Sequence, residues 1–447
     1  MRNISIFGTS SDAGKSTITL LISRIIQDLG YSVAPFKAQN VSNNAVVADD
    51  ESEIAVAQYF QAKALNITTS YHLNPVLLKS AKGSRTYLIV EGKVVKTQSV
   101  REYYRDIAKL QPVVEESFLH LDSRYDCVVA EGAGSPVELN LMDKDLSNIF
   151  VATRFNTKII LVADIEKGGV FASIYGVYNL LPKALQKNVI GVIINKFRGD
   201  ISLFDRGVEI IENKFKIPVL GVLPYVPFNL GFEDSQSLLN YQQIRGNIKR
   251  RVGVILYPHL SNYNDLEPLI LDPEVEVEFI RSSIDLEQFD EIILLGSKLV
   301  IEDLEWLKRV GLFDRLKRTK SNIIGICGGF EMMFKRLIDE FGVESNRGAV
   351  VEGLGFIDDD IIFKREKIVR RSIYNIFGRV VDGFEIHHGV SRNYPLYFED
   401  KNIKGTFIHG IFEDERFNIR KKRIIDGFIE QMRERVDMDL FLKSISI

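Results

Sequence analysis

The N-terminal segment joins a short apolar strand, a glycine-rich loop and the start of a helix, and this order is the strongest constraint on the fold. Residues 4–7 (ISIF) run into Gly8 and the loop TSSDA, which Gly14, Lys15 and Ser16 follow. Loop glycines let backbone N–H groups turn towards phosphate oxygens, and the start of a helix favours negative charge. Five residues separate the two glycines, where the usual motif has four. We interpret the segment as a phosphate-binding P-loop.

The P-loop interpretation gives the loop residues roles in binding ATP and Mg²⁺. The Lys15 ammonium would contact the β- and γ-phosphates, and the Ser16 hydroxyl would be a metal ligand. The loop residues predicted to bind ATP are Gly8, Thr9, Asp12, Ala13, Gly14, Lys15, Ser16 and Thr17. The alternative is a glycine-containing turn that Lys and Ser follow by chance.

Three carboxylates are candidates near the nucleotide, since Mg²⁺ prefers oxygen ligands. Glu131 follows the strand DCVVA, Asp164 follows IILVA, and Asp49 lies in the acidic loop ADDESE. Open α/β sheets bind ligands at the carboxyl ends of their strands. We predict Ser16, Glu131 and Asp49 as metal ligands and place Asp164 at the substrate site. For each carboxylate, the alternative is a solvated loop position or a helix cap.

Short β-branched runs alternate with longer amphipathic stretches, which is typical of a mostly parallel, doubly wound α/β sheet. Thr17–Leu29 is the first predicted helix, with Gly30 as its stop signal. The strands predicted in the first half are Asn3–Phe7, Ser32–Phe36, Asp126–Ala130, Lys158–Val162, Val189–Ile194 and Val219–Val222. The second series comprises Val252–Tyr257, Val275–Ile280, Glu291–Leu295 and Asn322–Ile326.

A polar stretch near 235–250 separates the two strand series and is the predicted linker. Residues 1–240 and 250–447 are therefore expected to form two domains, each long enough to bury a core. Arg416–Phe441 is amphipathic and charged, and we predict that it forms a surface helix packed on its own domain. A helix that binds a partner or a membrane is the alternative.

Composition excludes several classes of protein. The 57 Lys and Arg residues nearly balance 60 Asp and Glu residues, and a net charge of −3 argues against nucleic-acid binding through a cationic surface. Two distant cysteines form no disulfide framework and no cysteine-rich zinc site. The sequence shows no uninterrupted apolar run of about 18 residues and no signal-peptide pattern. We therefore expect a cytoplasmic protein without a membrane span.

A strand in the second half ends at a cysteine that two glycines follow. This segment, SNIIGI-Cys327-Gly328-Gly329, has the pattern of a nucleophile elbow, in which a tight turn exposes the thiol near a helix N-terminus. The Gly328 N–H could stabilise an oxyanion. His409, in GTFIHGIF, is the best candidate base, and His387 and His388, in GFEIHHG, are its rivals. The alternative is a buried structural cysteine.

Taken together, these motifs make the chain resemble the cobyric acid synthases, the glutamine-dependent amidases of cobalamin biosynthesis, over nearly its full length. The strings in the first half are GTSSDAGKS, APFKAQNVSNNAVV, LNPVLLK, REYY, EGAGSPVELNL, ADIEKGGVFAS and INKFRGD. Those in the second half are LSNYNDLEPL, GICGGF, EGLGF, GFEIHHG and GTFIHGIF. A sister family that makes the a,c-diamide of the same ring usually has another residue pair in place of Asp12 and Ala13.

The resemblance implies a dethiobiotin-synthetase-like P-loop domain followed by a class I glutamine amidotransferase domain. It implies ATP, Mg²⁺ and glutamine, and amidation of the b, d, e and g side-chain carboxylates of (adenosyl)cobyrinic acid a,c-diamide, a corrinoid, through an acyl phosphate and channelled ammonia. A related amidoligase acting on the corrin a,c positions or on a cell-wall peptide is the alternative. A non-catalytic ATP switch of the chromosome-partitioning type fits less well, since TSSDA lacks the additional lysine of those proteins.

The resemblance also assigns residues by position. Cys327 would be the glutaminase nucleophile and His409 its base, while Gly328 and Gly296 would offer oxyanion N–H groups. Asn195 matches the position that reads adenine in related ATPases. The residues that would line the site where ATP meets the ring's carboxylate are Lys37, Gln39, Asn40, Asn74, Lys79 and Asp164.

The chain departs from the family pattern around the thiol. Glu331 replaces a glutamine that often helps to hold the substrate, Phe334 replaces a glycine, and His259 stands where arginine is common. A carboxylate at 331 would repel the α-carboxylate of glutamine unless it is reoriented or protonated. Weakened use of glutamine, with free ammonia as the nitrogen source, is therefore a further hypothesis. Ile411 occupies the position of the glutamate in three-residue triads, which this family lacks as a whole.

Overall fold

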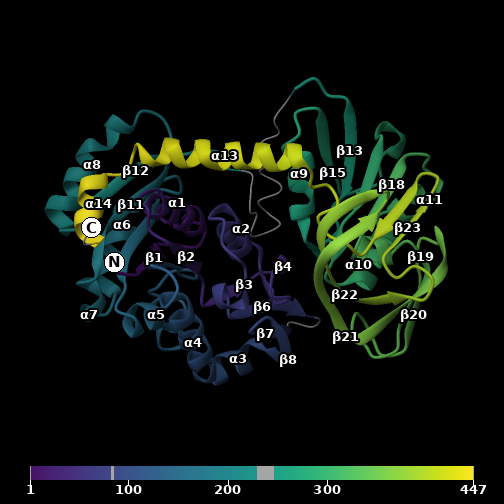
Figure 1. Ribbon diagram of the computed structural model, residues 1–447, viewed down its shortest axis with the longest axis horizontal. Coiled ribbons are helices and arrows are strands. Elements are labelled where there is room, and N and C mark those ends of the chain that lie inside the picture. Colours follow the sequence, from purple (N-terminus) through teal and green to yellow (C-terminus); the bar gives the residue numbers. More distant parts are fainter. Residues whose placement is uncertain (1, 82–84, 229–245, 446–447) are drawn as a thin grey trace.

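The computed structural model describes residues 2–81, 85–228 and 246–445, and it shows two α/β domains side by side (Figure 1). Most of the predicted linker near 235–250 lies outside these described ranges. The strand series of the second domain begins at Arg250.

The first domain is built on a six-stranded sheet with the order β12-β11-β10-β1-β9-β2, in which all neighbours are parallel. Its strands are β1 (Ile4–Gly8), β2 (Val33–Phe36), β9 (Cys127–Glu131), β10 (Lys158–Asp164), β11 (Val189–Phe197) and β12 (Val219–Pro224). Most of their side chains are buried, as expected for strands that are covered on both faces. The predicted doubly wound sheet is confirmed.

Helices cover this sheet, and the first follows the glycine-rich loop. The helices of the first domain are α1 (Lys15–Asp28), α2 (Val56–Ala64), α3 (Val100–Asp106), α4 (Gln111–Asp122), α5 (Ile149–Arg154), α6 (Val170–Leu180), α7 (Lys183–Gln186) and α8 (Asp205–Ile210). The apolar residues of α1 lie in one core cluster with Ile4, Ile6 and Val129 of the sheet. This packing fixes the start of α1 at the carboxyl end of β1.

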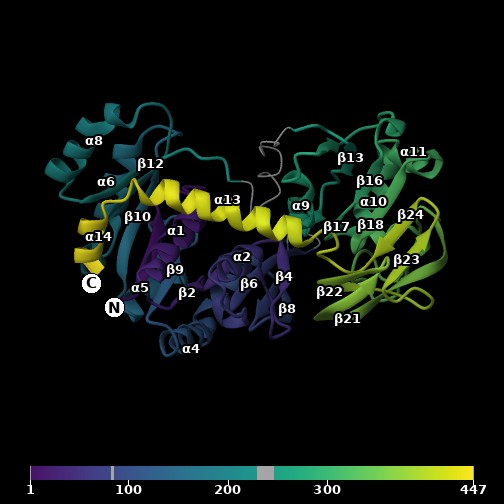
Figure 2. The ribbon, with the colours of Figure 1, turned by 45° about the horizontal axis from the view of Figure 1, so that its top comes forward.

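Two smaller β-elements stand on the side of the first domain that faces the second (Figures 1 and 2). One is a four-stranded sheet, β3-β6-β7-β8, formed by β3 (Gln39–Val41), β6 (Val76–Ala81), β7 (Arg85–Val90) and β8 (Lys93–Ser99). The other is the antiparallel pair β4 (Ala45–Val47) and β5 (Glu53–Ala55). Val46 and Ile54 of this pair pack with Phe384 and Ile386 of the second domain.

The second domain contains another six-stranded sheet, with the order β15-β13-β16-β18-β24-β23. All its neighbours are parallel except β23, which is antiparallel to β24. The strands are β13 (Arg250–Ile255), β15 (Val275–Ile280), β16 (Glu291–Leu294), β18 (Asn322–Ile326), β23 (Tyr397–Asp400) and β24 (Ile403–Thr406). Its helices are α9 (Glu267–Ile270), α10 (Val300–Arg309), α11 (Leu312–Arg318) and α12 (Gly328–Glu331).

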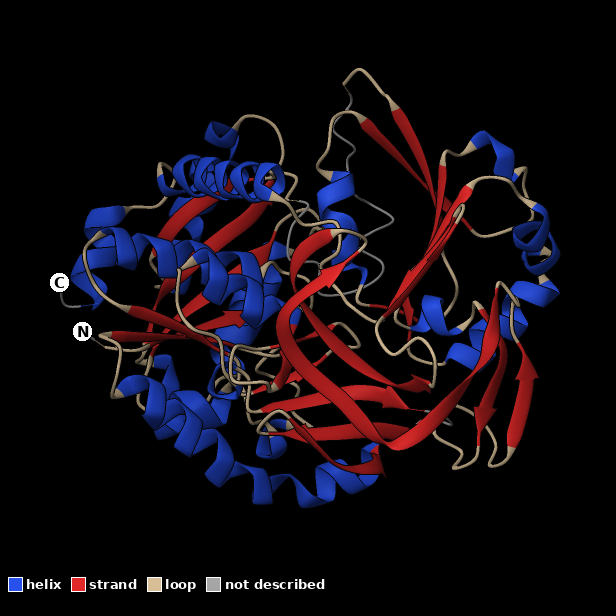
Figure 3. Ribbon diagram, turned by 45° about the vertical axis from the view of Figure 1, so that its right-hand side comes forward, coloured by secondary structure: helices blue, strands red, loops and turns tan. Residues whose placement is uncertain are grey.

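A long curved hairpin dominates the rest of the second domain (Figure 3). It consists of β21 (Ile357–Ile376) and β22 (Arg379–Ser391), which continue the sheet of β19 (Phe334–Asp339) and β20 (Ala349–Glu352). The short strands β14 (Leu260–Ser261) and β17 (Gly296–Ser297) also pair. The hairpin carries the GFEIHHG segment to the thiol and to the first domain.

The prediction that the C-terminal helix packs on its own domain is wrong. Helix α13 (Glu415–Arg433) leaves the second domain, crosses the first and leads to α14 (Met438–Ile445), as both views show (Figures 1 and 2). Its apolar side chains join the core cluster of α1, and Arg24 forms an ion pair with Asp426 at 3.0 Å. An amphipathic pattern defines an apolar face but not the surface that the face covers.

Among the described residues, no helix has the length and apolar character needed to cross a membrane.

Candidate active sites

The glycine-rich loop takes the backbone path that its sequence predicts. Gly14 has a φ of 96°, and a Cβ atom there would lie 2.1 Å from Nδ2 of Asn195, so only glycine fits. Asn195 donates from Nδ2 to the carbonyl of Ala13 at 2.9 Å, and Lys15 donates from Nζ to the carbonyl of Ser10 at 3.2 Å. The Lys15 ammonium therefore lies against the backbone of the loop, an arrangement that is compatible with a bound phosphate.

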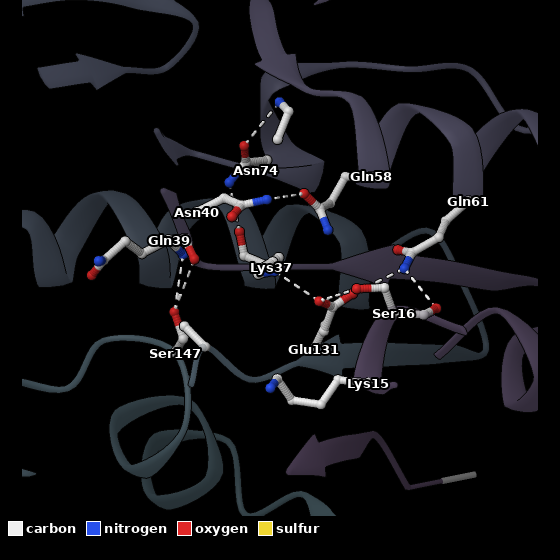
Figure 4. Close-up of polar contacts among 12 residues, drawn as sticks. Lys15, Ser16, Lys37, Gln39, Asn40, Gln58, Gln61, Asn74, Glu131 and Ser147 are labelled. Carbon is white, nitrogen blue, oxygen red and sulfur yellow. Dashed lines mark hydrogen bonds and ion pairs between the residues drawn. The ribbon is translucent and has the colours of Figure 1, made fainter. Parts of the chain in front are cut away.

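Glu131 is the centre of a buried polar cluster beside the loop (Figure 4). One carboxylate oxygen accepts from the Ser16 hydroxyl at 2.8 Å and from Lys37 Nζ at 2.7 Å. The other accepts from Gln61 Nε2 at 2.9 Å. Of the three predicted metal ligands, the structure thus brings Ser16 and Glu131 together. A hydroxyl and a carboxylate are oxygen donors of the kind that Mg²⁺ prefers, so this pair fits the ion.

Asp164 also lies next to the loop. Its carboxylate forms an ion pair with Lys196 at 3.0 Å, and Lys196 Nζ also donates to the carbonyl of Asp12 at 2.6 Å. Strand β10 ends at Asp164 and is the parallel neighbour of β1. The sheet edge therefore places this carboxylate beside the nucleotide loop, as expected for equivalent strand ends.

Asp49 is held at the boundary with the second domain. Lys63 Nζ lies 2.9 Å from its carboxylate, the Thr69 N–H donates to it at 2.9 Å, and Arg371 of β21 approaches to 3.7 Å. Burial raises the pKa of Asp49, but the Thr69 and Lys63 hydrogen bonds outweigh burial and lower it. These contacts account for the carboxylate without a metal ion, so the metal role of Asp49 stays a prediction.

Three predicted substrate residues gather around Lys37 (Figure 4). Asn74 donates to the Lys37 carbonyl at 3.0 Å, the Gln39 N–H donates to Ser147 Oγ at 3.1 Å, and Asn40 donates to Gln58 at 3.1 Å. Lys79 lies apart from this group, because its Nζ pairs with Glu53 at 2.6 Å on the side that faces the second domain.

Cys327 sits at a strained turn between β18 and α12. Its φ of 53° and ψ of −112° are rare for a residue with a side chain, and such strain is typical of nucleophile elbows. A Cβ atom on Gly328 would lie 2.6 Å from the Ser297 N, so the turn packs directly on the segment that begins at Gly296. The two predicted oxyanion glycines therefore lie on touching backbone segments.

His409 is paired with a carboxylate that the sequence did not reveal. Its Nδ1 lies 2.7 Å from Oδ2 of Asp265, whose other oxygen accepts from the Gly410 N–H at 2.8 Å. Burial disfavours a charged imidazole, but Asp265 and then Cys327 outweigh burial and raise the pKa of His409 to about 10. A thiol, an imidazole and a carboxylate thus form one buried set.

The rival histidines have other surroundings. His387 stacks on Phe407, and its two nitrogens face the Gly389 carbonyl at 2.7 Å and Glu385 at 3.4 Å. Burial, followed by repulsion from Lys367 and Lys298, lowers the pKa of His388 to about 3. By contrast, Asp265 and Cys327 raise the pKa of His409.

Glu331, the main departure from the family pattern, is fully buried near the thiol. One of its oxygens accepts from the Gly389 N–H at 3.1 Å. Burial, with repulsion from Cys327 and Glu344, raises the pKa of Glu331 well above its usual value. This shift favours the protonated acid, which has the shape and hydrogen-bonding capacity of a glutamine.

The other two departures are accommodated locally. Phe334 lies in the core and meets Phe330 edge to face at 5.0 Å. His259 Nδ1 lies 2.9 Å from Asp303, and that hydrogen bond raises the pKa of His259.

Comparisons with known proteins agree with both halves of this description. Residues 4–230 match the CobQ/CobB/MinD/ParA nucleotide binding domain, and residues 251–417 match the CobB/CobQ-like glutamine amidotransferase domain. A cobyric acid synthase from Acinetobacter baylyi is 59% identical, and the match covers 100% of this chain and 99% of that protein.

The chain belongs to the cobyric acid synthase family. It is an ATP-dependent glutamine amidotransferase ligase of cobalamin biosynthesis. A probable cobyric acid synthase from Picrophilus torridus is 40% identical over 93% of this chain and 91% of its own length. A cobyric acid synthase from Clostridium kluyveri is 38% identical over 100% of this chain and 98% of its own length.

Proposed function

We propose that this enzyme amidates the b, d, e and g carboxylates of (adenosyl)cobyrinic acid a,c-diamide, with glutamine as the nitrogen source and ATP as the activating agent. The observation that carries the proposal is the presence, in one chain, of a phosphate loop with a buried Ser16–Glu131 pair and of a thiol–imidazole–carboxylate set. The first suits activation of a carboxylate, and the second suits release of ammonia. Membership of the family supports the choice of acceptor.

In the first domain, the carboxylate of the acceptor attacks the γ-phosphorus of ATP, which gives an acyl phosphate and ADP. Lys15 offsets charge on the transferred phosphoryl group, and the loop orients it. Ser16 and Glu131 would hold Mg²⁺, which would neutralise phosphate charge. Lys37 bridges Glu131 to the Asn74 and Asn40 region, where we place the acceptor carboxylate.

In the second domain, the Cys327 sulfur attacks the side-chain amide carbon of glutamine. His409 gives a proton to the departing nitrogen, and ammonia leaves a thioester that water hydrolyses to glutamate. The Gly328 and Gly296 segments supply N–H groups for the oxyanion. Asp265 holds the imidazole through Nδ1, so that Nε2 is the nitrogen that serves the sulfur.

Ammonia must then reach the acyl phosphate before water does. The contact between the domains offers a sheltered route. Val46 and Ile54 of the first domain pack on Phe384 and Ile386 of the second. The Ile386 carbonyl oxygen lies 3.7 Å from the sulfur of Cys327, so this apolar contact begins beside the thiol. Asn262 also donates to the Ala45 carbonyl across this boundary. The attack of ammonia on the acyl phosphate forms the amide and releases phosphate.

The test is mass spectrometry of the corrinoid product after incubation with ATP and either glutamine or ammonium chloride. The wild type should add four amide groups with both nitrogen sources, and Cys327→Ala should do so with ammonium alone. Product masses with the corrin a,c-diacid or a cell-wall peptide as the acceptor separate this function from that of a related amidoligase. Failure of ATP turnover to depend on the a,c-diamide would remove the substrate assignment.

A further inference from the structure

A cavity of about 1060 Å³ lies between the small sheet of the first domain and the long hairpin of the second. Residues of both domains line it, among them Lys79 and Tyr87 on one side and Lys298, Lys367 and His388 on the other. The cavity is large enough to admit glutamine, and the reaction sequence assigned above does not use its side chains.

Three lysines converge in this cavity on one buried carboxylate. Glu53 pairs with Lys79 at 2.6 Å and with Lys367 at 2.7 Å, and together with Lys298 they hold its pKa far below the usual value despite its burial. Lys298 lies with Nζ 5.0 Å from the centre of the Tyr87 ring. It forms no ion pair within the part of the chain that the structure describes. Positive charge therefore exceeds negative charge at this point.

The excess of positive charge also shifts the pKa values of groups within the cluster. Burial, with repulsion from Lys79 and Lys367, lowers the pKa of Lys298 well below its usual value. Glu344 is a second nearby carboxylate, but burial raises its pKa to about 7, so it is only partly ionised at neutral pH. An incoming carboxylate would relieve the repulsion among the lysines and restore the charge of Lys298.

Lys298 follows directly on the backbone at Ser297, which packs against the turn that carries the thiol. Lys298 follows Gly296 by two residues, and a Cβ atom on Gly296 would lie 3.5 Å from Cε1 of His409. Cys327 is itself among the groups that affect the pKa of Lys79. Glutamine bound with its side-chain amide at the sulfur places its α-carboxylate roughly 5 Å away by standard bond lengths.

We propose that Lys298, with Lys79 and Lys367, binds the α-carboxylate of glutamine, so that the glutamine site is shared between the two domains. The inference rests on the proposed function and names the side chains that would recognise glutamine, the nitrogen donor of that reaction. The lysine from the first domain makes glutamine binding depend on docking of the amidating domain. Ammonia is then released only where an acyl phosphate can capture it.

The experiment compares two nitrogen donors in the full-length enzyme: L-glutamine, and 4-aminobutanamide, which is glutamine without its α-carboxylate. Lys298→Met should raise the KM for glutamine about tenfold or more, and it should leave the KM for 4-aminobutanamide within about twofold. Lys79→Met should act in the same direction. Lys96→Met is the matched control, because Lys96 lies on β8 in an exposed pair with Asp106 at 3.4 Å.

Ammonium-driven amidation by the Lys298→Met and Lys96→Met enzymes, and the circular dichroism spectrum and thermal unfolding of Lys79→Met, report whether the variants are folded. An unchanged KM for glutamine in both lysine variants overturns the inference. A rise in the KM for the corrinoid alone also overturns it, since the lysines would then bind a corrin carboxylate. A wild-type enzyme that forms no product with glutamine or with ammonium would instead refute the proposed function.

Discussion

Replacement of Asp265 by asparagine is the sharpest probe of the glutaminase site. The amide oxygen of the new side chain would still accept from the Gly410 N–H, but its NH₂ group would face His409 Nδ1 as a donor. The imidazole would then carry its proton on Nε2, where it could not accept one from the thiol. The substitution is nearly isosteric, so it changes charge and tautomer more than packing.

The size of the effect follows from burial. His409 and Asp265 have side chains that are only 1% and 4% exposed, and they lie 2.7 Å apart. Loss of one partner of a buried charged pair costs about 3–5 kcal/mol. If that energy is lost from the transition state, glutamine-driven turnover falls about 10²–10⁴-fold, while ammonium-driven turnover stays within about twofold.

The pH dependence separates a positioning role for Asp265 from a purely structural one. The pKa of His409 is raised from 6.5 to about 10, so stability from the pair is fully present below about pH 6.5 and is lost as the pH rises through about 10. Glutaminase activity should have its alkaline limb near the upper value. In Asp265→Asn the limb should move to lower pH, because burial is then opposed by Cys327 without the Asp265 carboxylate.

The assay is glutamate release and amide formation between pH 5 and pH 11, with Asp285→Asn as the control. Asp285 is an exposed aspartate that accepts from the Glu287 N–H, so its replacement should leave both activities unchanged. An Asp265→Asn enzyme with wild-type glutamine turnover and an unmoved alkaline limb would refute this reasoning.

Three further predictions address other parts of the molecule. Lys15→Met should abolish amidation with glutamine and with ammonium alike, because the transferred phosphoryl group loses its counter-charge. ADP release measures this loss, and retention of either activity would contradict the assignment of the loop. Glu331→Gln should stabilise the protein increasingly as the pH rises from 5 to 8 in denaturant titrations, because an acid with a raised folded-state pKa makes the wild type less stable above the unfolded value of 4.5. A stability difference that does not change with pH would count against a raised pKa of Glu331. Gly221→Ala should lower the free energy of unfolding by about 1–3 kcal/mol, because the new Cβ would lie 2.4 Å from the Arg435 carbonyl oxygen. Gly427→Ala in α13 should raise the free energy of unfolding by up to about 1 kcal/mol, because the new Cβ would meet no atom within 4 Å. Calorimetry that reversed this order would disprove the prediction.

The local features of both sites could be predicted from the sequence. Gly14, Lys15 and Ser16 follow a strand and begin a helix, and Cys327 ends a strand before two glycines, so short-range rules suffice for each. The strand ends of a parallel sheet then bring Glu131 and Asp164 to the loop. These predictions need only the direction of the chain and the order of its elements.

Contacts between distant segments could not be predicted in this way. Asp265 lies in the string LSNYND, 144 residues before its partner His409, and carries no local sign of that pairing. Lys79 belongs to a string that resembles a substrate site, yet its place along β6 takes it to the side that faces the other domain. The raised pKa of Glu331 depends on burial, which the identity of one residue in the sequence does not disclose.

The path of α13 has a consequence for how the protein is made. Phe428, Ile429 and Met432 complete the core beside α1, but the ribosome adds them only after the whole second domain. At roughly 5–20 residues per second, the ribosome takes about 10–40 s to add the roughly 200 residues from Pro224, where β12 ends, to Phe428, which covers the face of α1. The nascent first domain must spend that interval with apolar surface exposed, so we expect chaperones to bind it and early termination to leave it prone to aggregation.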